Sequence, residues 1–525
     1  MLVGSYGKGA LAKQGTLTLA SSQGINAAYD AYQVFAADVD ADGTTTNVTW
    51  ATDEMRDLVL PYLDEQGYGD WLAQHHPGDG QREMAQNAAE YISAMVCNPS
   101  SPREETSPAQ APDASFSNGL AKALSASSAI QPQNVMAGEP FVAEQGLWLL
   151  VSSAANGKDS AGTAPIWVPV TEEATQIADK SSLPTIDKQV KEDSDGSWGK
   201  LADASRGQDL EFSIAGTLPE NLGAYSHYHY RIVDHFSEGI EPAIVSQSDL
   251  ADAIKITIDG TDAKPDDVNL ILSYDQGTLS IEFTDLLSDH WEAYGINAQS
   301  VICVRYQAHL TQAAIIGAEG NPNEAYLVYT NDPVTEQDGQ TNTVVNKVFA
   351  YALELQKKGA DGKTDLKGAR FSLKPQGEEL YVQQDGSLGS DPYDFTTDDE
   401  GRVRIPCLDE GTYALKETVA PDGYSTLPDD LVLTITSELD ATDLAVKRIG
   451  SELSGSQAQV EGIDATSGQI EISVTDEPLS PGVERLAQTG GGPAAAVLAG
   501  SGLGILLLSH AREATSHKKR YRRRH

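Results

Sequence analysis

In three segments of the last third of the chain, apolar residues at every second position are followed by an ionisable residue at the next such position. These ionisable residues are Lys357, Glu417 and Asp476. Side chains alternate between the two faces of a β-strand, so each of them shares a face with residues two and four positions earlier. Those earlier positions are all apolar: Leu353 and Leu355, Tyr413 and Leu415, Ile472 and Val474. One amine and two carboxyl groups on inward faces would be costly unless they pair or react with one another.

The segment around Glu417 carries a specific motif. Residues 413–424 read YALKETVAPDGY, which matches every fixed position of the pattern YxLxETxAPxGY. This pattern resembles the E-box of the B-type domains of pilins and collagen adhesins. The resemblance implies that a lysine on the first strand, here Lys357, bonds covalently to an Asn or Asp on the last strand. Here that acceptor is Asp476, and the E-box Glu417 would assist.

Burial would favour this chemistry. It lowers the pKa of a lysine and raises the pKa of a carboxylic acid. Lys357 would then be a neutral amine, which is the nucleophilic form. A neutral Glu417 could donate a hydrogen bond to the carbonyl of Asp476 and carry protons. The alternative is a buried ion-pair cluster without a covalent bond.

A second set of candidates lies in the preceding region. Lys188, Asp234 and Asn323 each share a strand face with apolar neighbours in segments 184–190, 229–236 and 321–331. This region resembles the pilin D2 domain, an A-type sandwich that forms a Lys–Asn isopeptide bond with the help of an acidic residue. The resemblance rests on four sequence patterns that occur in this order: PTxxKxV, DGSWG, YxxxD and GNxNxAxLxYxND.

The resemblance implies a bond between Lys188 and Asn323, assisted by Asp234. Both Lys188 and Asn323 lie near the start of their strands, as a parallel pairing of first and last strands requires. Asn331 is the alternative acceptor. The alternative for Lys188 is an edge lysine that extends its amine into solvent.

The C-terminal segment combines three features in a fixed order. The pentapeptide consists of Leu486, Ala487, Gln488, Thr489 and Gly490. An uncharged run from Ala494 to Ser509 follows, and the tail 510–525 carries seven Lys/Arg and one Glu. As a helix at about 1.5 Å per residue, the run would be a short membrane span of roughly 25 Å. The basic tail would stay on the cytoplasmic side.

This order resembles the cell-wall sorting signal of Gram-positive surface proteins, in its LAxTG variant. The resemblance implies that a sortase cuts between Thr489 and Gly490. The Thr489 carbonyl would pass to an amine of the cell wall or of another pilin. An ordinary C-terminal membrane anchor is the alternative.

Composition agrees with an exported protein. The 525 residues allow three or four domains, and the net charge of −41 disfavours nucleic acid and anionic lipid as partners. Three cysteines far apart in sequence argue against a disulfide framework. Residues 1–19 contain no apolar core of a signal peptide, so we expect one to be encoded ahead of Met1.

The pattern of elements predicts four parts. Residues 1–178 combine strand signals with helical patches that start at Thr52/Asp53 and span about 79–96, and they resemble the N-terminal domain of pilin subunits. Alternating strands separated by Gly, Asp and Asn turns then predict two immunoglobulin-like β-sandwiches, divided by the polar loop 331–343. The predicted domains are 1–178, 179–345 (A-type), 346–480 (B-type) and 481–525, the last with a transmembrane helix at 493–509.

The leading hypothesis is therefore a structural one: a cell-wall-anchored fimbrial subunit with two self-formed cross-links, located outside the cell. Its expected partners are sortase, peptidoglycan or other pilin subunits, and host or bacterial surface ligands. No metal, cofactor or catalytic set for an external substrate is expected. Shaft pilins carry a VYPK motif whose lysine accepts the next subunit. Lys180 stands in that place here, but Val-Tyr-Pro is missing. The alternative is a ligand-binding adhesin with its site in residues 1–178.

Overall fold

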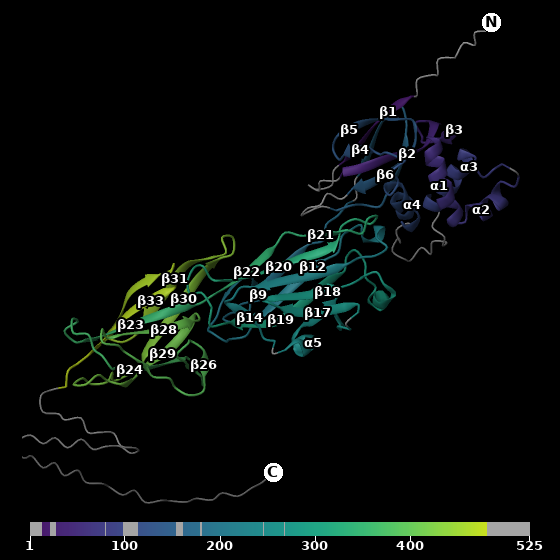
Figure 1. Ribbon diagram of the computed structural model, residues 1–525. Helices are drawn as coiled ribbons and strands as arrows, with labels where there is room; N and C mark the ends of the chain where they lie inside the picture. The colour runs from purple at the N-terminus through teal and green to yellow at the C-terminus, as the bar shows by residue number, and fades with distance from the viewer. Residues whose placement is uncertain are drawn as a thin grey trace, which may run out of the picture. The chain divides into compact units, whose positions relative to one another are not determined.

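The fold is described from a computed structural model of the chain (Figure 1). The described residues are 13–20, 28–78, 80–97, 114–153, 161–178, 181–244, 246–266 and 268–479. The chain forms two units, Met1–Pro478 and Leu479–His525, and every sheet described below lies in the first. The architecture is mainly β, as the sequence predicts. Among the described residues no helix is long and apolar enough to cross a membrane, and the predicted sorting helix at 493–509 lies outside them.

The N-terminal part combines two sheets with a helical insert (Figure 1). One sheet has the order β3-β2-β6-β7 with β4 beside β2, and the other has the order β5-β1-β8. The strands are β1 (Gln14–Ala20), β2 (Ala28–Val39), β3 (Thr45–Trp50), β4 (Gln133–Met136), β5 (Pro140–Glu144), β6 (Gly146–Ser153), β7 (Ile166–Val170) and β8 (Ala174–Ala178). The insert between β3 and β4 holds α1 (Asp53–Glu65), α2 (Tyr68–His75), α3 (Ala85–Cys97) and α4 (Ser115–Ser125).

The helices cover one face of the larger sheet, because Leu60 of α1 and Leu120 of α4 share a core with Phe35 and Leu149 of the strands. The predicted start of α1 is confirmed, since the Thr52 side chain accepts a hydrogen bond from Met55 N at 3.1 Å. The predicted start of the next helix near residue 79 is wrong.

That helix, α3, begins only at Ala85. Gly78 and Gly80 have φ values of 151° and 77°, which a right-handed helix cannot accommodate. Helices α2 and α4 were not predicted. Each is short, and its apolar face becomes recognisable only against the shared core.

The middle sandwich consists of two facing sheets. One has the order β10-β9-β12-β19-β15-β16 with β14 on β19, and the other has the order β11-β22-β20-β13-β18-β17 with β21 on β20. The strands are β9 (Ile186–Lys191), β10 (Trp198–Gly199), β11 (Leu201–Asp203), β12 (Leu210–Thr217), β13 (Tyr230–Phe236), β14 (Ile240–Pro242), β15 (Lys255–Ile258), β16 (Thr261–Ala263), β17 (Leu270–Asp275), β18 (Thr278–Phe283), β19 (Val301–Leu310), β20 (Asn321–Thr330), β21 (Asp338–Gln340) and β22 (Val344–Phe349). A short helix, α5 (Leu250–Ala253), precedes β15.

Local sequence sets the register of two hairpins in this sandwich. Asp259-Gly260 joins β15 to β16, and Gln276-Gly277 joins β17 to β18. All four residues have positive φ, between 47° and 81°. This is the two-residue turn whose twist matches that of antiparallel strands.

The C-terminal sandwich follows directly. Its sheets have the orders β28-β23-β33-β32 and β27-β24-β29-β30-β31, with a small β25-β26 ribbon. The strands are β23 (Tyr351–Gly359), β24 (Arg370–Pro375), β25 (Tyr381–Val382), β26 (Leu388–Gly389), β27 (Phe395–Thr396), β28 (Arg402–Leu408), β29 (Gly411–Val419), β30 (Leu431–Asp440), β31 (Ala445–Leu453), β32 (Ala458–Asp464) and β33 (Gln469–Asp476). The predicted boundary at 345/346 falls inside β22, which pairs with β20 and β11 of the middle sandwich.

Candidate functional site

The C-terminal sandwich brings Lys357, Asp476 and Glu417 together in its core. Strands β23 and β33 are parallel neighbours, with Lys357 opposite Val474 and Gly359 opposite Asp476. The side chains of Lys357 and Asp476 therefore leave the same face of this sheet. Glu417 comes from β29 in the facing sheet.

The three groups are in direct contact. Lys357 Nζ lies 2.5 Å from Asp476 Oδ1 and 3.1 Å from Glu417 Oε1, and all three side chains have zero exposure. Glu417 Oε2 accepts a hydrogen bond from Leu427 N at 2.8 Å. The Phe371 ring centroid lies 5.5 Å from the amine. The reactive atoms are therefore close together and shielded from water.

Burial changes the proton affinity of the acid. It raises the pKa of Glu417 to about 6, although the neighbouring Lys357 charge opposes this shift. Glu417 thus retains a proton more readily than an exposed glutamate does. An amine, a carboxyl carbon and a proton carrier within one dry core can support amide formation.

The middle sandwich places Lys188 against Asp234. The Lys188 amine forms an ion pair with Asp234 Oδ1, and neither side chain is exposed. The rings of Phe212, Phe236 and Tyr306 have their centroids 5.7–5.9 Å from Lys188 Nζ. The structure therefore excludes the alternative of an edge lysine with its amine in solvent.

Tyr306 joins this pair to Asn323. The Tyr306 hydroxyl donates to Asp234 Oδ2 at 2.5 Å, and Asn323 Nδ2 donates to the Tyr306 oxygen at 2.9 Å. Burial lowers the pKa of Lys188 to about 8, against the opposing effect of Asp234. Burial and the Asp234 charge raise the pKa of Tyr306 well above its usual value. The phenol is therefore a neutral donor.

The predicted parallel pairing of the strands that carry Lys188 and Asn323 is wrong. Lys188 lies on β9, which pairs antiparallel with β10 and β12, whereas Asn323 lies on β20 in the facing sheet. Side-chain alternation predicts which face a residue occupies but does not assign its strand to a sheet. Both residues are buried in the core, where Tyr306 connects Asn323 to Asp234, the ion-pair partner of Lys188.

The alternative acceptor Asn331 lies elsewhere. It follows β20 at the end where Thr330 pairs with Asp338 of β21. Eight positions along a strand separate it from Asn323, which is roughly 26 Å. The structure thus brings Asn323, and not Asn331, to the Lys188–Asp234 pair.

Comparisons with known proteins agree with this architecture. The family model described as "SpaA: Prealbumin-like fold domain" matches residues 351–448. The chain is therefore similar to this domain family over these residues. The matched residues include Lys357 and Glu417 and end before β33, which carries Asp476.

One curated protein matches in sequence over part of its length. The chain is 26% identical over 269 residues to the trypsin-resistant surface T6 protein of Streptococcus pyogenes serotype M6. The match covers 48% of this chain and 45% of that protein, so the chain spans about half of the relative it matches.

Solved structures extend the likeness beyond the SpaA domain. The T6 backbone pilin of serotype M6 S. pyogenes matches with a TM-score of 0.54 and 16% identity, over 90% of this chain and 100% of that one. The full-length major pilin SpaD of Corynebacterium diphtheriae gives a TM-score of 0.46 and 15% identity, over 89% and 98% of the two chains. The T6 match shows a shared multidomain β fold.

Several predicted site residues lie outside the described part of the chain. They are Lys180 and the sorting pentapeptide Leu486, Ala487, Gln488, Thr489 and Gly490. Conversely, no motif in the sequence indicates Tyr306. It lies on the inward face of β19 among Val304 and Ala308, where its alternation resembles that of an ordinary core tyrosine.

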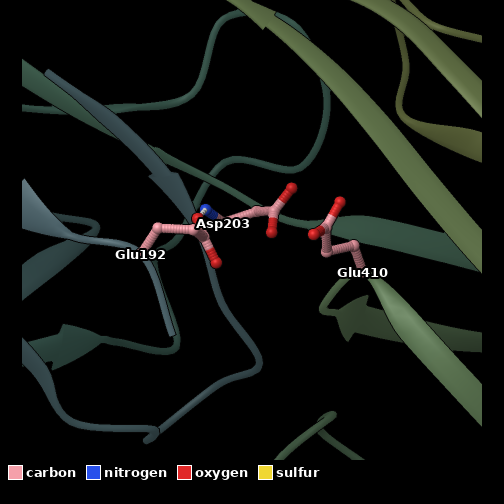
Figure 2. A group of neighbouring side chains, drawn as sticks. All are labelled: Glu192, Asp203 and Glu410. Carbon is pink, nitrogen blue, oxygen red and sulfur yellow. Dashed lines mark hydrogen bonds between the residues drawn. The ribbon is translucent and has the colours of Figure 1, made fainter. Parts of the chain in front are cut away.

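A group of carboxylates was also not predicted (Figure 2). One oxygen each of Glu192, Asp203 and Glu410 lies within 4.8 Å of the others. Asp203 is fully buried, and its Oδ2 accepts hydrogen bonds from Tyr351 Oη at 2.6 Å and Ser437 Oγ at 2.7 Å. Such oxygens are of the type that binds Ca²⁺ or Mg²⁺. Glu410 lies more than 200 positions from Glu192 and Asp203 in sequence, so no spacing motif indicates the group.

Burial and mutual repulsion raise the pKa values of the acidic residues in this part of the molecule. Burial and the Asp203 charge raise the pKa of Glu192 to about 7. The same two causes raise the pKa of Asp409 well above its usual value. The native protein therefore binds protons here more tightly than the unfolded chain does.

We expect the Glu192 carboxyl to make the protein less stable as the pH rises. Its folded pKa of about 7 exceeds the ordinary value of 4.5, so its contribution is fully present below pH 4.5 and is lost as the pH rises through about 7. Glu192→Gln should flatten this part of the stability profile in urea unfolding. Glu220→Gln, at an exposed glutamate of the same sandwich, is the control. An unchanged profile in Glu192→Gln would contradict the assignment.

Proposed function

We propose that the chain is a structural subunit of Gram-positive surface fimbriae, in which self-formed isopeptide bonds lock both sandwiches. The observation that carries this proposal is the buried contact of Lys357 with Asp476 and Glu417 between the first and last strands of the C-terminal sandwich. The fold shared with the T6 backbone pilin supports the same conclusion. The proposed division into domains is 1–178, 179–345, 346–480 and 481–525, with the whole of β22 counted to the middle sandwich.

In the C-terminal sandwich, the proposed reaction joins Lys357 Nζ to Asp476 Cγ. The lysine first loses a proton to a neighbouring carboxylate, and the neutral amine then attacks the protonated Asp476 carboxyl group. One C–N bond forms, one C–O bond breaks, and the oxygen leaves as water with a proton delivered by Glu417, which then takes up the second proton of Lys357 Nζ. The 3.1 Å contact between Lys357 and Glu417 supports this role.

In the middle sandwich, the proposed bond joins Lys188 to Asn323 and releases ammonia. Asp234 is the acid that receives the first lysine proton, because its Oδ1 is paired with the amine. Phe212 and Phe236 keep water from the pair. The lowered pKa of Lys188 favours the nucleophilic form.

Such bonds would give mechanical strength to an exported protein without disulfides. A Lys357–Asp476 bond would close a loop of about 120 residues, which in the loop-entropy treatment of cross-links stabilises the fold by about 5 kcal/mol. Strands β23 and β33 are hydrogen-bonded neighbours. A force applied to the two ends of the sandwich would therefore be carried by the amide bond before the strands of the sheet could separate. Reductants do not cleave an amide.

The full chain should weigh less than its sequence predicts, by one water and one ammonia. Glu417→Ala should restore the water alone and Asp234→Ala the ammonia alone, because each acid serves one core. Intact mass and sequencing of the linked peptides measure both. Glu452→Ala, at an exposed acid of the C-terminal sandwich, should leave the mass deficit unchanged. An unmodified mass in the wild-type protein would reduce both sites to buried polar clusters.

We further propose that the chain is attached to the cell wall through Thr489, within the pentapeptide 486–490. Thr489→Ala should leave the protein in the membrane fraction, because a sortase would have no Thr carbonyl to transfer. Fractionation of the native host measures this. Gln488→Ala, at the variable position of the pentapeptide, is the matched control. Normal release of Thr489→Ala with wall fragments would refute sortase attachment at this residue.

Lys180 is the candidate amine for polymerisation. If the chain is a shaft subunit, Lys180→Arg should abolish high-molecular-weight ladders of the protein in wall extracts of the host. Lys200→Arg, at an exposed lysine of the middle sandwich, should keep them. Persistence of the ladders in Lys180→Arg would exclude this lysine as the linking residue.

A further inference from the structure

We propose that Tyr306 is a catalytic residue of the middle sandwich, which carries a proton from Asp234 to the leaving nitrogen of Asn323. This inference rests on the proposed Lys188–Asn323 bond and names the group that completes its chemistry. Three observations carry it: the position of the ring, the order of the hydrogen bonds, and the proton balance of the reaction.

The Tyr306 ring is held rigidly between the two sheets. It lies on β19, opposite Phe212 of β12, and the two rings stack at 5.5 Å with an interplanar angle of 3°. Phe236 meets it edge-on at 5.7 Å. The hydroxyl is therefore fixed in the core beside the Lys188 amine, and bulk water cannot replace it.

The hydrogen bonds run in a single direction. Asp234 Oδ1 is occupied by Lys188, and Oδ2 accepts the only proton of the Tyr306 hydroxyl. The Tyr306 oxygen in turn accepts from Asn323 Nδ2. Among the hydrogen bonds of the described residues, Tyr306 is the link between the acid and the reacting amide. Nδ2 is the atom that must depart as ammonia.

The reaction needs a proton on Asn323 Nδ2, the leaving nitrogen. Lys188 gives one proton to Asp234, and the neutral Nζ attacks Asn323 Cγ to form a C–N bond. Nδ2 of the planar amide has no available lone pair, but it gains one when Cγ becomes tetrahedral. It can then accept the Tyr306 proton while Tyr306 takes the proton of Asp234. The C–Nδ2 bond breaks and ammonia leaves. The second proton of Nζ returns to Asp234, so every proton is accounted for without an oxidant or co-reactant.

The C-terminal sandwich provides an internal contrast. There the acid Glu417 contacts the lysine amine directly, and the leaving group is water. Tyr413, which shares the inward face of β29 with Glu417, instead donates its hydroxyl proton to Asp409 O at 2.9 Å. A change at Tyr306 should therefore affect one bond and not the other within the same molecule.

The test follows both bonds over time in full-length chains made by cell-free synthesis. Tyr306→Phe keeps the stacked ring and removes the hydroxyl. We expect formation of the Lys188–Asn323 bond to slow by about 100-fold, the lower range for loss of a general acid–base group. The Lys357–Asp476 bond should form at the wild-type rate, which also reports that the C-terminal sandwich has folded.

Tyr230→Phe is the matched control, because its hydroxyl is buried in the same core and forms no hydrogen bond among the described residues. It should leave both rates unchanged. Incorporation of 3-fluorotyrosine at position 306 distinguishes proton transfer from mere positioning of the amide. It keeps the hydrogen bonds and makes the phenol more acidic, so it should change the rate if the proton moves.

The outcomes separate this inference from the proposed function. If the wild-type protein forms no Lys188–Asn323 bond, the proposed function of the middle sandwich is wrong. If the bond forms equally fast in wild type and Tyr306→Phe, the isopeptide proposal stands and the role of Tyr306 is refuted. An unchanged rate with the fluorinated residue would likewise refute proton transfer through Tyr306. If Tyr306→Phe does not fold, the fluorinated protein alone decides.

Discussion

Each sandwich depends on the burial of one lysine amine against a carboxyl group. Moving an isolated ammonium ion from water into a protein core costs several kcal/mol, and the loss of its partner leaves that cost uncompensated. Lys188 and Lys357 are both at most 1% exposed and lie among aromatic rings. The surrounding core residues therefore have a second task besides packing, because they determine how readily these groups give up or hold their protons.

The two sites differ in how they arrange the partners of the buried lysine amine. In the C-terminal sandwich, Lys357 and Asp476 come from neighbouring parallel strands, and the assisting Glu417 reaches in from the facing sheet. In the middle sandwich, Lys188 faces Asp234 and Asn323 across the core, and Tyr306 connects the last two. In the C-terminal sandwich the acid contacts the amine directly, whereas in the middle sandwich Tyr306 lies between the acid and the amide.

Acidic residues also gather where the two sandwiches meet. The Asp203 carboxylate of the middle sandwich accepts from Tyr351 and Ser437 of the C-terminal sandwich, close to Glu192 and Glu410 (Figure 2). Within the described residues, no Lys, Arg or His forms an ion pair with these three acids. Protons or a cation would relieve the repulsion between these carboxylates.

The sequence by itself determined the faces on which the reactive side chains lie. A period of two places Lys357, Glu417 and Asp476 among apolar residues, and the structure buries all three. The E-box motif and the β pattern were sufficient to indicate the class of fold, which the SpaA match and the T6 structure share. These features are local, since they depend on spacing within single strands and turns.

Only the tertiary structure decided which of these strands meet. It placed Lys188 and Asn323 in opposite sheets, contrary to the predicted parallel pairing, and it selected Asn323 over Asn331. It also brought in Tyr306, whose sequence context is that of any core tyrosine. Glu410 comes from a segment far from Glu192 and Asp203, and the three carboxylates meet only in the tertiary structure. Strand order and the packing of one sheet on another depend on contacts between residues far apart in the chain, which no local pattern specifies.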